Sequence, residues 1–159
     1  MPDLNRLDQL LVTRRLFDSR SRARDAIDRG AVKVDGKIVT KAGTPVSKDA
    51  KIEIDDPAQS YVSRAALKLI AALDHFDLSP GGLDCLDIGA STGGFTQVLL
   101  ARGANHVIAL DVGHDQLDKR LRGDARITNI EGLNARMLSS EHLGGRTIKA
   151  VVSDVSFIS

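Results

Sequence analysis

The chain has 159 residues, about the length of one average domain, and its 42% apolar and 27% charged residues are typical of an ordinary globular protein. This composition excludes wholesale disorder, collagen-like repeats and a coiled coil, and no apolar run reaches the ~18 residues of a membrane helix. Residues 1–52 hold 12 basic and 7 acidic residues, whereas residues 53–159 hold 10 and 14. We therefore expect two modules, the first with a polyanion as partner, and the lone Cys85 favours a cytoplasmic location.

Two helices are expected at the start of the chain. Leucines at helical spacing predict an amphipathic helix over residues 4–16. Asp18 or Ser19 can cap a second helix that runs to Arg29. Gly30 then fits the left-handed position that ends many helices.

A small sheet is expected after these helices. Residues 32–39 alternate between apolar and polar about an Asp35-Gly36 pair, which is the sequence signal of a β-hairpin. Gly43 and Pro45 interrupt the pattern before a further strand at residues 52–54. The first module is therefore a small α+β domain.

A polar segment with a proline, residues 55–60, is predicted to link domain 1–54 to domain 61–159. Ser63 can cap a helix that follows it. From there, short buried strands alternate with helices, which predicts an α/β fold with a parallel, doubly wound sheet. The expected strands are 85–88, 107–111, 127–130 and 148–154, with a helix at 94–102. Because only about four strands are laid down, we expect a partial Rossmann-like domain from the front of a longer protein.

A glycine-rich segment, DIGASTGGF at residues 87–95, lies between the first of these strands and the helix. Small residues there let the backbone approach a ligand at the carboxyl end of a strand. Asp111, 24 residues after Asp87, closes the next strand, where a carboxylate can accept hydrogen bonds from ribose hydroxyls. The pattern predicts an adenosine-containing cofactor, with close packing at Gly93 and Gly94 as the alternative.

Two other kinds of site fit the sequence less well. Residues 89–93 match the G-x-S-x-G nucleophile elbow, but that strand opens its domain here, whereas in hydrolases it follows several others. No spacing of histidine, cysteine and acidic residues indicates a metal site, and Cys85 is most simply a small buried hydrophobic residue. We therefore expect neither a hydrolase nor a metal.

Several segments occur in one order along the chain: YVSRAALKL at 61–69, LDIGASTGGFT at 86–96, ALDVG at 109–113 and SDVSF at 153–157. Together they resemble the TlyA, or haemolysin-A-like, ribosomal RNA methyltransferases, part of the FtsJ-like group that methylates ribose 2′-hydroxyls with S-adenosylmethionine. RLD at 6–8, SRSRAR at 19–24 and GAVKVDG at 30–36 resemble the RNA-binding domain named after ribosomal protein S4. The resemblance implies ribosomal RNA or ribosomal subunits as partners.

The resemblance implies roles for individual residues of the second domain. Lys68 and Asp154 match the first two members of the family's catalytic set of lysine, aspartate and a second lysine. That second lysine would fall beyond residue 159, so we expect little or no methyl transfer by the 159-residue chain alone. The residues expected at the cofactor are Asp87, Gly89, Ser91, Gly93, Asp111 and, near the adenine, Glu131.

Basic residues of the first domain are expected to contact RNA. Arg20 and Arg24 share a helix face, Arg6 begins the preceding helix, and Lys33 and Lys37 flank the hairpin turn. If the helix and the hairpin pack side by side, these five residues form one basic surface. Since aromatic residues are scarce, at 3%, contacts to phosphates and riboses are expected rather than base stacking.

Three other functions remain open on the sequence. A non-catalytic RNA-binding protein would not need the glycine loop or Asp111, and both are present. A nicotinamide-dependent enzyme shares the loop but not Lys68 or the surroundings of Asp154. A pore-forming haemolysin would need an apolar or strongly amphipathic segment, which the sequence does not supply.

Overall fold

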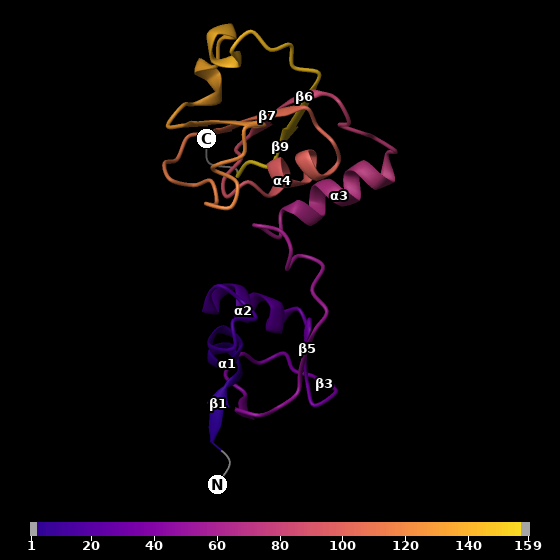
Figure 1. The fold of residues 1–159 in the computed structure, drawn as a ribbon, viewed down its shortest axis with the longest axis vertical. Coiled ribbons are helices and arrows are strands. Elements are labelled where there is room, and N and C mark those ends of the chain that lie inside the picture. The colour runs from indigo at the N-terminus through magenta and orange to yellow at the C-terminus, as the bar shows by residue number, and fades with distance from the viewer. Residues whose placement is uncertain (1–2, 157–159) are drawn as a thin grey trace. The chain divides into compact units, whose positions relative to one another are not determined.

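The computed structural model describes residues 3–156, and the chain divides into two compact units between Pro57 and Ala58 (Figure 1). This boundary falls inside the linker predicted at 55–60. Phe157 of the SDVSF segment lies outside the described residues.

The first unit combines two helices with two small antiparallel sheets. One sheet pairs β1 with β4, and the other has the order β3-β2-β5. In chain order the elements are β1 (Leu4–Arg6), α1 (Leu7–Thr13), α2 (Arg20–Asp28), β2 (Val32–Val34), β3 (Lys37–Ile38), β4 (Pro45–Ser47) and β5 (Ile52–Ile54).

The helix predicted over residues 4–16 is wrong at both ends, because α1 spans only Leu7–Thr13. Residues 4–6 instead pair with β4, and the pairing continues into the helix, where the Leu7 and Asp8 N–H groups each donate to a carbonyl of residues 42–44 at 3.0 Å. These N–H groups have no partner within a helix, so the turn that precedes β4 satisfies them. At the other end, Arg15 has a φ of +57°, which stops the helix.

The second helix and the hairpin are confirmed. The Ser19 hydroxyl caps α2 by accepting from the N–H of Arg22 at 3.3 Å, and Gly30 follows with a φ of +76°. Asp35 and Gly36 have φ values of +48° and +80°, as a two-residue hairpin turn requires. The sequence predicts the second helix and the hairpin correctly because both depend on capping and turn residues that act over a few positions of the backbone.

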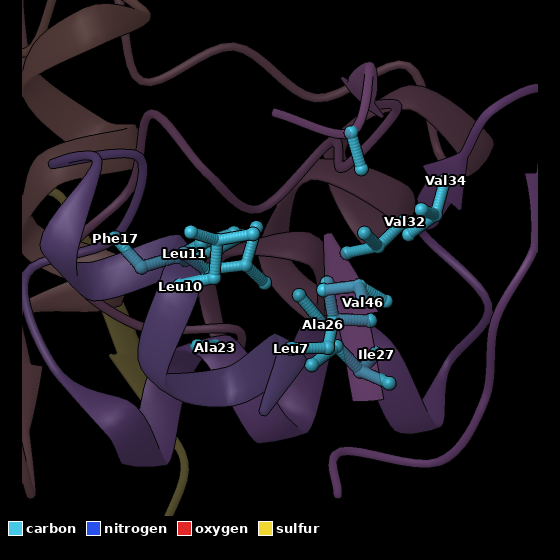
Figure 2. Packing of buried hydrophobic residues seen from close by; sticks show 11 residues of the cluster. Leu7, Leu10, Leu11, Phe17, Ala23, Ala26, Ile27, Val32, Val34 and Val46 are labelled. Carbon is cyan, nitrogen blue, oxygen red and sulfur yellow. The ribbon is translucent and has the colours of Figure 1, made fainter. Parts of the chain in front are cut away.

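The core of the first unit joins both helices to β2 and β4 (Figure 2). Leu7, Leu11 and Ile27 are fully buried there. Each such side chain contributes roughly 1.5–3 kcal/mol when it leaves water. The core therefore fixes the relative positions of α1 and α2, and with them the polar side chains on their outer faces.

The second unit is built on a four-stranded parallel sheet of order β8-β7-β6-β9. The chain adds β7 and β8 on one side of β6, then crosses back to add β9 on the other side. This is the doubly wound topology that the sequence predicted, and ligands bind such sheets where the strand order reverses. Its elements are α3 (Ala66–His75), β6 (Asp84–Ile88), α4 (Gly94–Ala101), β7 (His106–Asp111), β8 (Ile127–Glu131), η1 (Ala135–Met137), η2 (Ser140–Leu143) and β9 (Ala150–Ser153).

The two faces of the parallel sheet carry separate apolar clusters. Cys85 and Val107 lie in one cluster with α3 and α4, whereas Leu86 and Ile108 lie in the other with Leu143 of η2 and with Leu133 and Leu138, which flank η1. Successive strand residues point to opposite faces, so β7, which is buried on both faces, needs the continuous apolar run at residues 107–110. Ser63 does not cap α3 directly; its hydroxyl accepts from the N–H of Ala65 at 3.1 Å in the turn before the helix.

Within residues 3–156, no helix combines the length and the apolar character that crossing a membrane requires.

Candidate functional site

A cavity of about 170 Å³ opens at the carboxyl ends of β6 and β9, where the strand order of the second unit reverses. The glycine-rich segment that follows β6 forms one wall, and the turn before α3 forms another. The lining residues are Ser63, Ala65, Asp87, Gly89, Ala90, Ser91, Thr92, Gly94, Phe95 and Asp154. The cavity thus occupies the position at which this fold class binds its ligands.

The backbone of the glycine-rich segment is shaped by residues in the left-handed region. Gly89 has a φ of +75°, and a Cβ added to it would come within 2.7 Å of the Val155 side chain. Ser91 adopts a φ of +51°, which is uncommon for a residue other than glycine. Only a residue without a side chain fits at Gly89, so the cavity wall there is bare backbone.

Gly93 has a different environment from Gly89. Its φ is +100°, and an added Cβ would come within 2.5 Å of Leu121 and 2.7 Å of Leu117. Gly93 is absent from the cavity lining, whereas Gly94 is part of it. The sequence is compatible with either cofactor approach or close packing at Gly93, and the contacts found there are those of close packing.

Asp87, the last residue but one of β6, lines the cavity with a carboxyl group that is almost fully buried. Its Oδ2 accepts from the Thr96 hydroxyl at 2.7 Å. Burial raises the pKa of Asp87 to about 6, with added repulsion from Asp111 and Asp154, although the hydrogen bonds from Thr96 oppose the rise. A neighbouring cation would stabilise the ionised form of such a buried carboxyl group.

Asp111 ends β7 and holds two loops together through its carboxylate. One oxygen accepts from the N–H of Ser91 and the other from the N–H of Gly113, each at 2.8 Å. Asp111 therefore ties the glycine-rich segment to the loop that follows β7, and it lies beside the cavity rather than in its lining.

Glu131 ends β8 opposite Asp111 in the register of the sheet. Its carboxylate accepts backbone N–H groups of residues 115, 116 and 117 at 2.7–3.3 Å, and it also accepts from the side chain of Asn129. These hydrogen bonds, the one from Asn129 foremost, lower the pKa of Glu131. Glu131 shapes the loop after β7, and like Asp111 it lies outside the cavity lining.

Lys68 and Asp154 form an ion pair although 86 residues separate them in the chain. The distance between Lys68 Nζ and Asp154 Oδ2 is 2.8 Å. The Lys68 side chain on α3 is 67% exposed, and the Asp154 side chain just after β9 is 33% exposed. The pair thus lies at the edge of the cavity with the ammonium group open to a large partner.

In the first unit, three of the predicted RNA-binding arginines converge on one carboxylate. Asp8 is fully buried, and it is contacted by Arg6 Nε at 3.1 Å and by Arg20 and Arg24 at 2.9 Å each. We call these four residues the Asp8 cluster. The two lysines have other neighbours: Lys33 lies opposite Glu53 on the neighbouring strand, and Lys37 lies opposite Val34.

Sequence reasoning assigned no role to Asp8 or Thr96, although both occur in the quoted motifs. Asp8 stands among apolar helix positions, which is a sequence signal for a buried acid, but no local pattern indicates its contacts with the arginines. Thr96 lies nine residues after Asp87, and nothing in that spacing indicates their contact.

The comparisons with known proteins agree with this architecture. The FtsJ-like methyltransferase family matches residues 61–159, and the S4 domain matches residues 5–52. The chain belongs to the FtsJ-like methyltransferase family. It carries an S4 domain before the methyltransferase domain, as the resemblance in the sequence implied.

Individual relatives with known names or structures are similar to this chain over almost its whole length. The chain is 48% identical over 155 residues to the 16S/23S rRNA (cytidine-2′-O)-methyltransferase TlyA of Mycobacterium tuberculosis and 45% identical over 154 residues to Hemolysin A of Brachyspira hyodysenteriae. Both matches cover 97% of this chain, but only 58% and 64% of those proteins. A solved structure from Streptococcus thermophilus that bears a hemolysin name is 37% identical with a TM-score of 0.66, over 100% of this chain and 58% of that one. The chain thus spans less than two thirds of these relatives.

Proposed function

We propose that the protein is a ribosomal RNA 2′-O-ribose methyltransferase that uses S-adenosylmethionine. The observation that carries the proposal is the Lys68–Asp154 ion pair at the edge of an acidic cavity, in a chain of the FtsJ-like family. Relatives named as rRNA methyltransferases support the choice of RNA as substrate.

The residues of the cavity fit this cofactor. S-adenosylmethionine carries positive charge on its sulfonium and amino groups, and the cavity offers the carboxyl groups of Asp87 and Asp154. The bare backbone at Gly89 allows close approach by a ligand. We assign Asp87 to the amino end of the cofactor, Gly89 and Ser91 to its methionine and ribose part, and Asp111 to the ribose hydroxyls.

Two of the residues expected at the cofactor, Gly93 and Glu131, lie outside the cavity lining, and we propose an indirect role for each. Gly93 supports the glycine-rich segment by its packing against Leu117 and Leu121. Glu131 orders the loop after β7, and we propose that it positions the adenine through that loop. The bound cofactor supplies an activated methyl group, so the protein's remaining task is to orient the acceptor hydroxyl.

Lys68 and Asp154 are suited to that task. A ribose hydroxyl is a poor nucleophile until a neighbouring base or cation favours its alkoxide form. The ammonium group of Lys68 stabilises negative charge that develops on the hydroxyl oxygen, and Asp154 holds this ammonium group in place at 2.8 Å. The exposure of Lys68 leaves room for an RNA backbone to reach it.

We assign RNA binding to the first unit, through Arg6, Arg20 and Arg24 with further charge from Lys33 and Lys37. Guanidinium groups match phosphate oxygens in geometry, and the three arginine side chains are each about half exposed. Contacts of this kind position an RNA without reading its bases.

Two measurements test the proposal. Calorimetry on this chain should detect binding of S-adenosylmethionine. Methyl transfer to unmodified ribosomal subunits, measured with the intact gene product, should label ribose 2′-oxygens in the digested RNA. Absence of cofactor binding, or label on bases alone, would contradict the proposal.

A further inference from the structure

We propose that Asp8 is a positioning residue for RNA binding: its buried carboxylate fixes the guanidinium groups of Arg6, Arg20 and Arg24 as one phosphate-binding surface. This inference rests on the RNA-binding role proposed above for the first unit. It gives Asp8 a positive role in RNA binding, although its negative charge, taken alone, would repel RNA.

The geometry of the Asp8 cluster is the first support. Asp8 lies in the first turn of α1, its side chain is fully buried, and both of its oxygens accept from arginine. Arg6 contacts both oxygens, at 3.1 and 3.4 Å, so it binds as a fork. Arg20 and Arg24 reach the same Oδ2 from α2, one turn apart. One carboxylate thus joins β1, α1 and α2.

The exposure of the arginines is the second support. Their side chains are 46–50% exposed, although the carboxylate that holds them is not exposed at all. A guanidinium group has five N–H donors, and Arg20 and Arg24 each use only one of them on Asp8. The remaining donors can face a ligand. Arg6 is also confined from another side, because a Cβ on Gly43 would lie 3.2 Å from its guanidinium.

The charge of the cluster is the third support. Three arginines around one carboxylate keep a net charge of about +2, which still attracts a polyanion. Burial opposes ionisation of Asp8, but its hydrogen bonds to the three arginines outweigh burial, and the pKa of Asp8 lies well below its usual range. The carboxylate therefore stays charged wherever the protein is folded near neutral pH.

Fixing the arginines in advance favours binding, because side chains that are already ordered lose less entropy when a ligand arrives. Long-range charge alone makes the opposite prediction. Removing a negative charge from a basic surface should strengthen its attraction for RNA. The two accounts therefore differ in the sign of the effect when Asp8 loses its charge.

The test compares Asp8→Asn with Asp28→Asn, which removes the same charge from an exposed position on α2. Binding to purified total ribosomal RNA is measured over a range of salt concentrations, with thermal melting of each variant as a check of folding. We expect Asp8→Asn to bind about tenfold more weakly, and Asp28→Asn to bind as well as the unchanged chain or slightly better. Equal or tighter binding by folded Asp8→Asn would overturn the inference.

Two further comparisons separate positioning from a general structural role. In a chain that already carries Arg20→Ala and Arg24→Ala, the added Asp8→Asn change should weaken binding less than about twofold, because it acts through those arginines. If Asp8→Asn does not fold, Arg24→Lys is compared with Arg22→Lys, since both changes keep the charge and, of these two arginines, Arg24 is the one in the Asp8 cluster, where its Nε donates to Asp8. Weaker binding by Arg24→Lys alone supports the inference, and equal binding by the two overturns it.

The proposed RNA role and the inference fail in different ways. If the unchanged chain shows no salt-dependent binding to ribosomal RNA, the RNA-binding role falls and the inference falls with it. If the unchanged chain binds but the Asp8 variant binds equally well, only the inference falls.

Discussion

The two units of the chain each bury an aspartate, and they treat it in opposite ways. Asp8 is surrounded by three arginines, which hold its pKa well below its usual range. Asp87 has a hydroxyl as its side-chain partner and other carboxylates nearby, and its pKa rises to about 6. The charge of Asp8 is thus balanced by arginines within the protein, whereas the side-chain hydrogen-bond partner of Asp87 is the uncharged hydroxyl of Thr96. The difference supports both proposals: that Asp8 positions the arginines of an RNA-binding surface, and that Asp87 binds the positively charged amino end of the cofactor.

The largest expected effect concerns the ion pair next to Asp87. Lys68→Ala should reduce methyl transfer by about 10²–10⁴-fold while the affinity for S-adenosylmethionine stays the same, because the role proposed for Lys68 is to act on the acceptor hydroxyl and not on the cofactor. Rates and calorimetric affinities of the intact gene product check both parts. Lys149→Ala is the matched control, because Lys149 directly precedes β9, whereas Asp154, the partner of Lys68, directly follows it. A rate within twofold of the unchanged protein would remove Lys68 from the reaction.

The raised pKa of Asp87 predicts a pH dependence of stability. Its pKa is about 6 in the folded chain against 3.8 for the ordinary group, so the folded state holds the proton more tightly. The contribution of Asp87 to the free energy of unfolding is therefore most favourable below about pH 4 and is lost as the pH rises through about 6, by on the order of 2–3 kcal/mol. Asp87→Asn should remove this fall. Denaturant unfolding at several pH values measures it, with Asp77→Asn, an exposed change in the same unit, as the control.

A substitution of Asp111 tests the cofactor-binding role proposed for the second unit. Asp111→Ala should weaken S-adenosylmethionine binding by about 1–3 kcal/mol, the range for lost hydrogen bonds to a charged group. The loss has two sources, the ribose hydroxyls and the loops that its carboxylate joins. Asp115→Asn in the neighbouring loop removes the charge of a side chain that is 90% exposed and should leave affinity unchanged, because asparagine tolerates the φ of +52° at this position and keeps the N–H that Glu131 accepts. Unchanged calorimetric affinity of Asp111→Ala would contradict the cofactor assignment.

The smallest expected effect is a change of salt dependence in the first unit. Arg24→Ala should reduce the slope of log affinity against log salt by about 0.7–0.9 if it removes one phosphate contact. Arg22→Ala removes the same charge from the same helix outside the Asp8 cluster and should change the slope less. Equal changes for both variants would mean that charge alone, and not the cluster, sets RNA affinity.

Much of the second unit could be predicted from the sequence. β7 is mostly a continuous apolar run, β6 and β8 are short segments that include apolar residues, and α4 has one apolar face, so the local pattern predicts these four elements in chain order. In the first unit the same reasoning failed at Leu4–Arg6, because their partner strand lies about 40 residues away and begins at Pro45. A proline can open an edge strand, where its missing N–H costs little.

The candidate site was predictable only in part. Asp87 and Gly89 could be placed at a strand end, but the contact between Lys68 and Asp154 spans 86 residues and entered the sequence analysis through a family resemblance. Neither the spacing of Asp8 from its arginines nor the packing of Gly93 against Leu121 follows from local pattern. Such contacts depend on how helices pack across a core, which short-range preferences do not determine.

The most direct test of this account is to follow the carboxyl carbons of Asp8 and Asp87 by NMR as the pH is lowered, with and without S-adenosylmethionine. The account predicts that Asp87 titrates near pH 6 without cofactor and at a lower pH with it, whereas the pKa of Asp8 lies below the usual range of an aspartate in both cases. Titration of both residues near their ordinary value, or an Asp87 titration that the cofactor leaves unmoved, would contradict it.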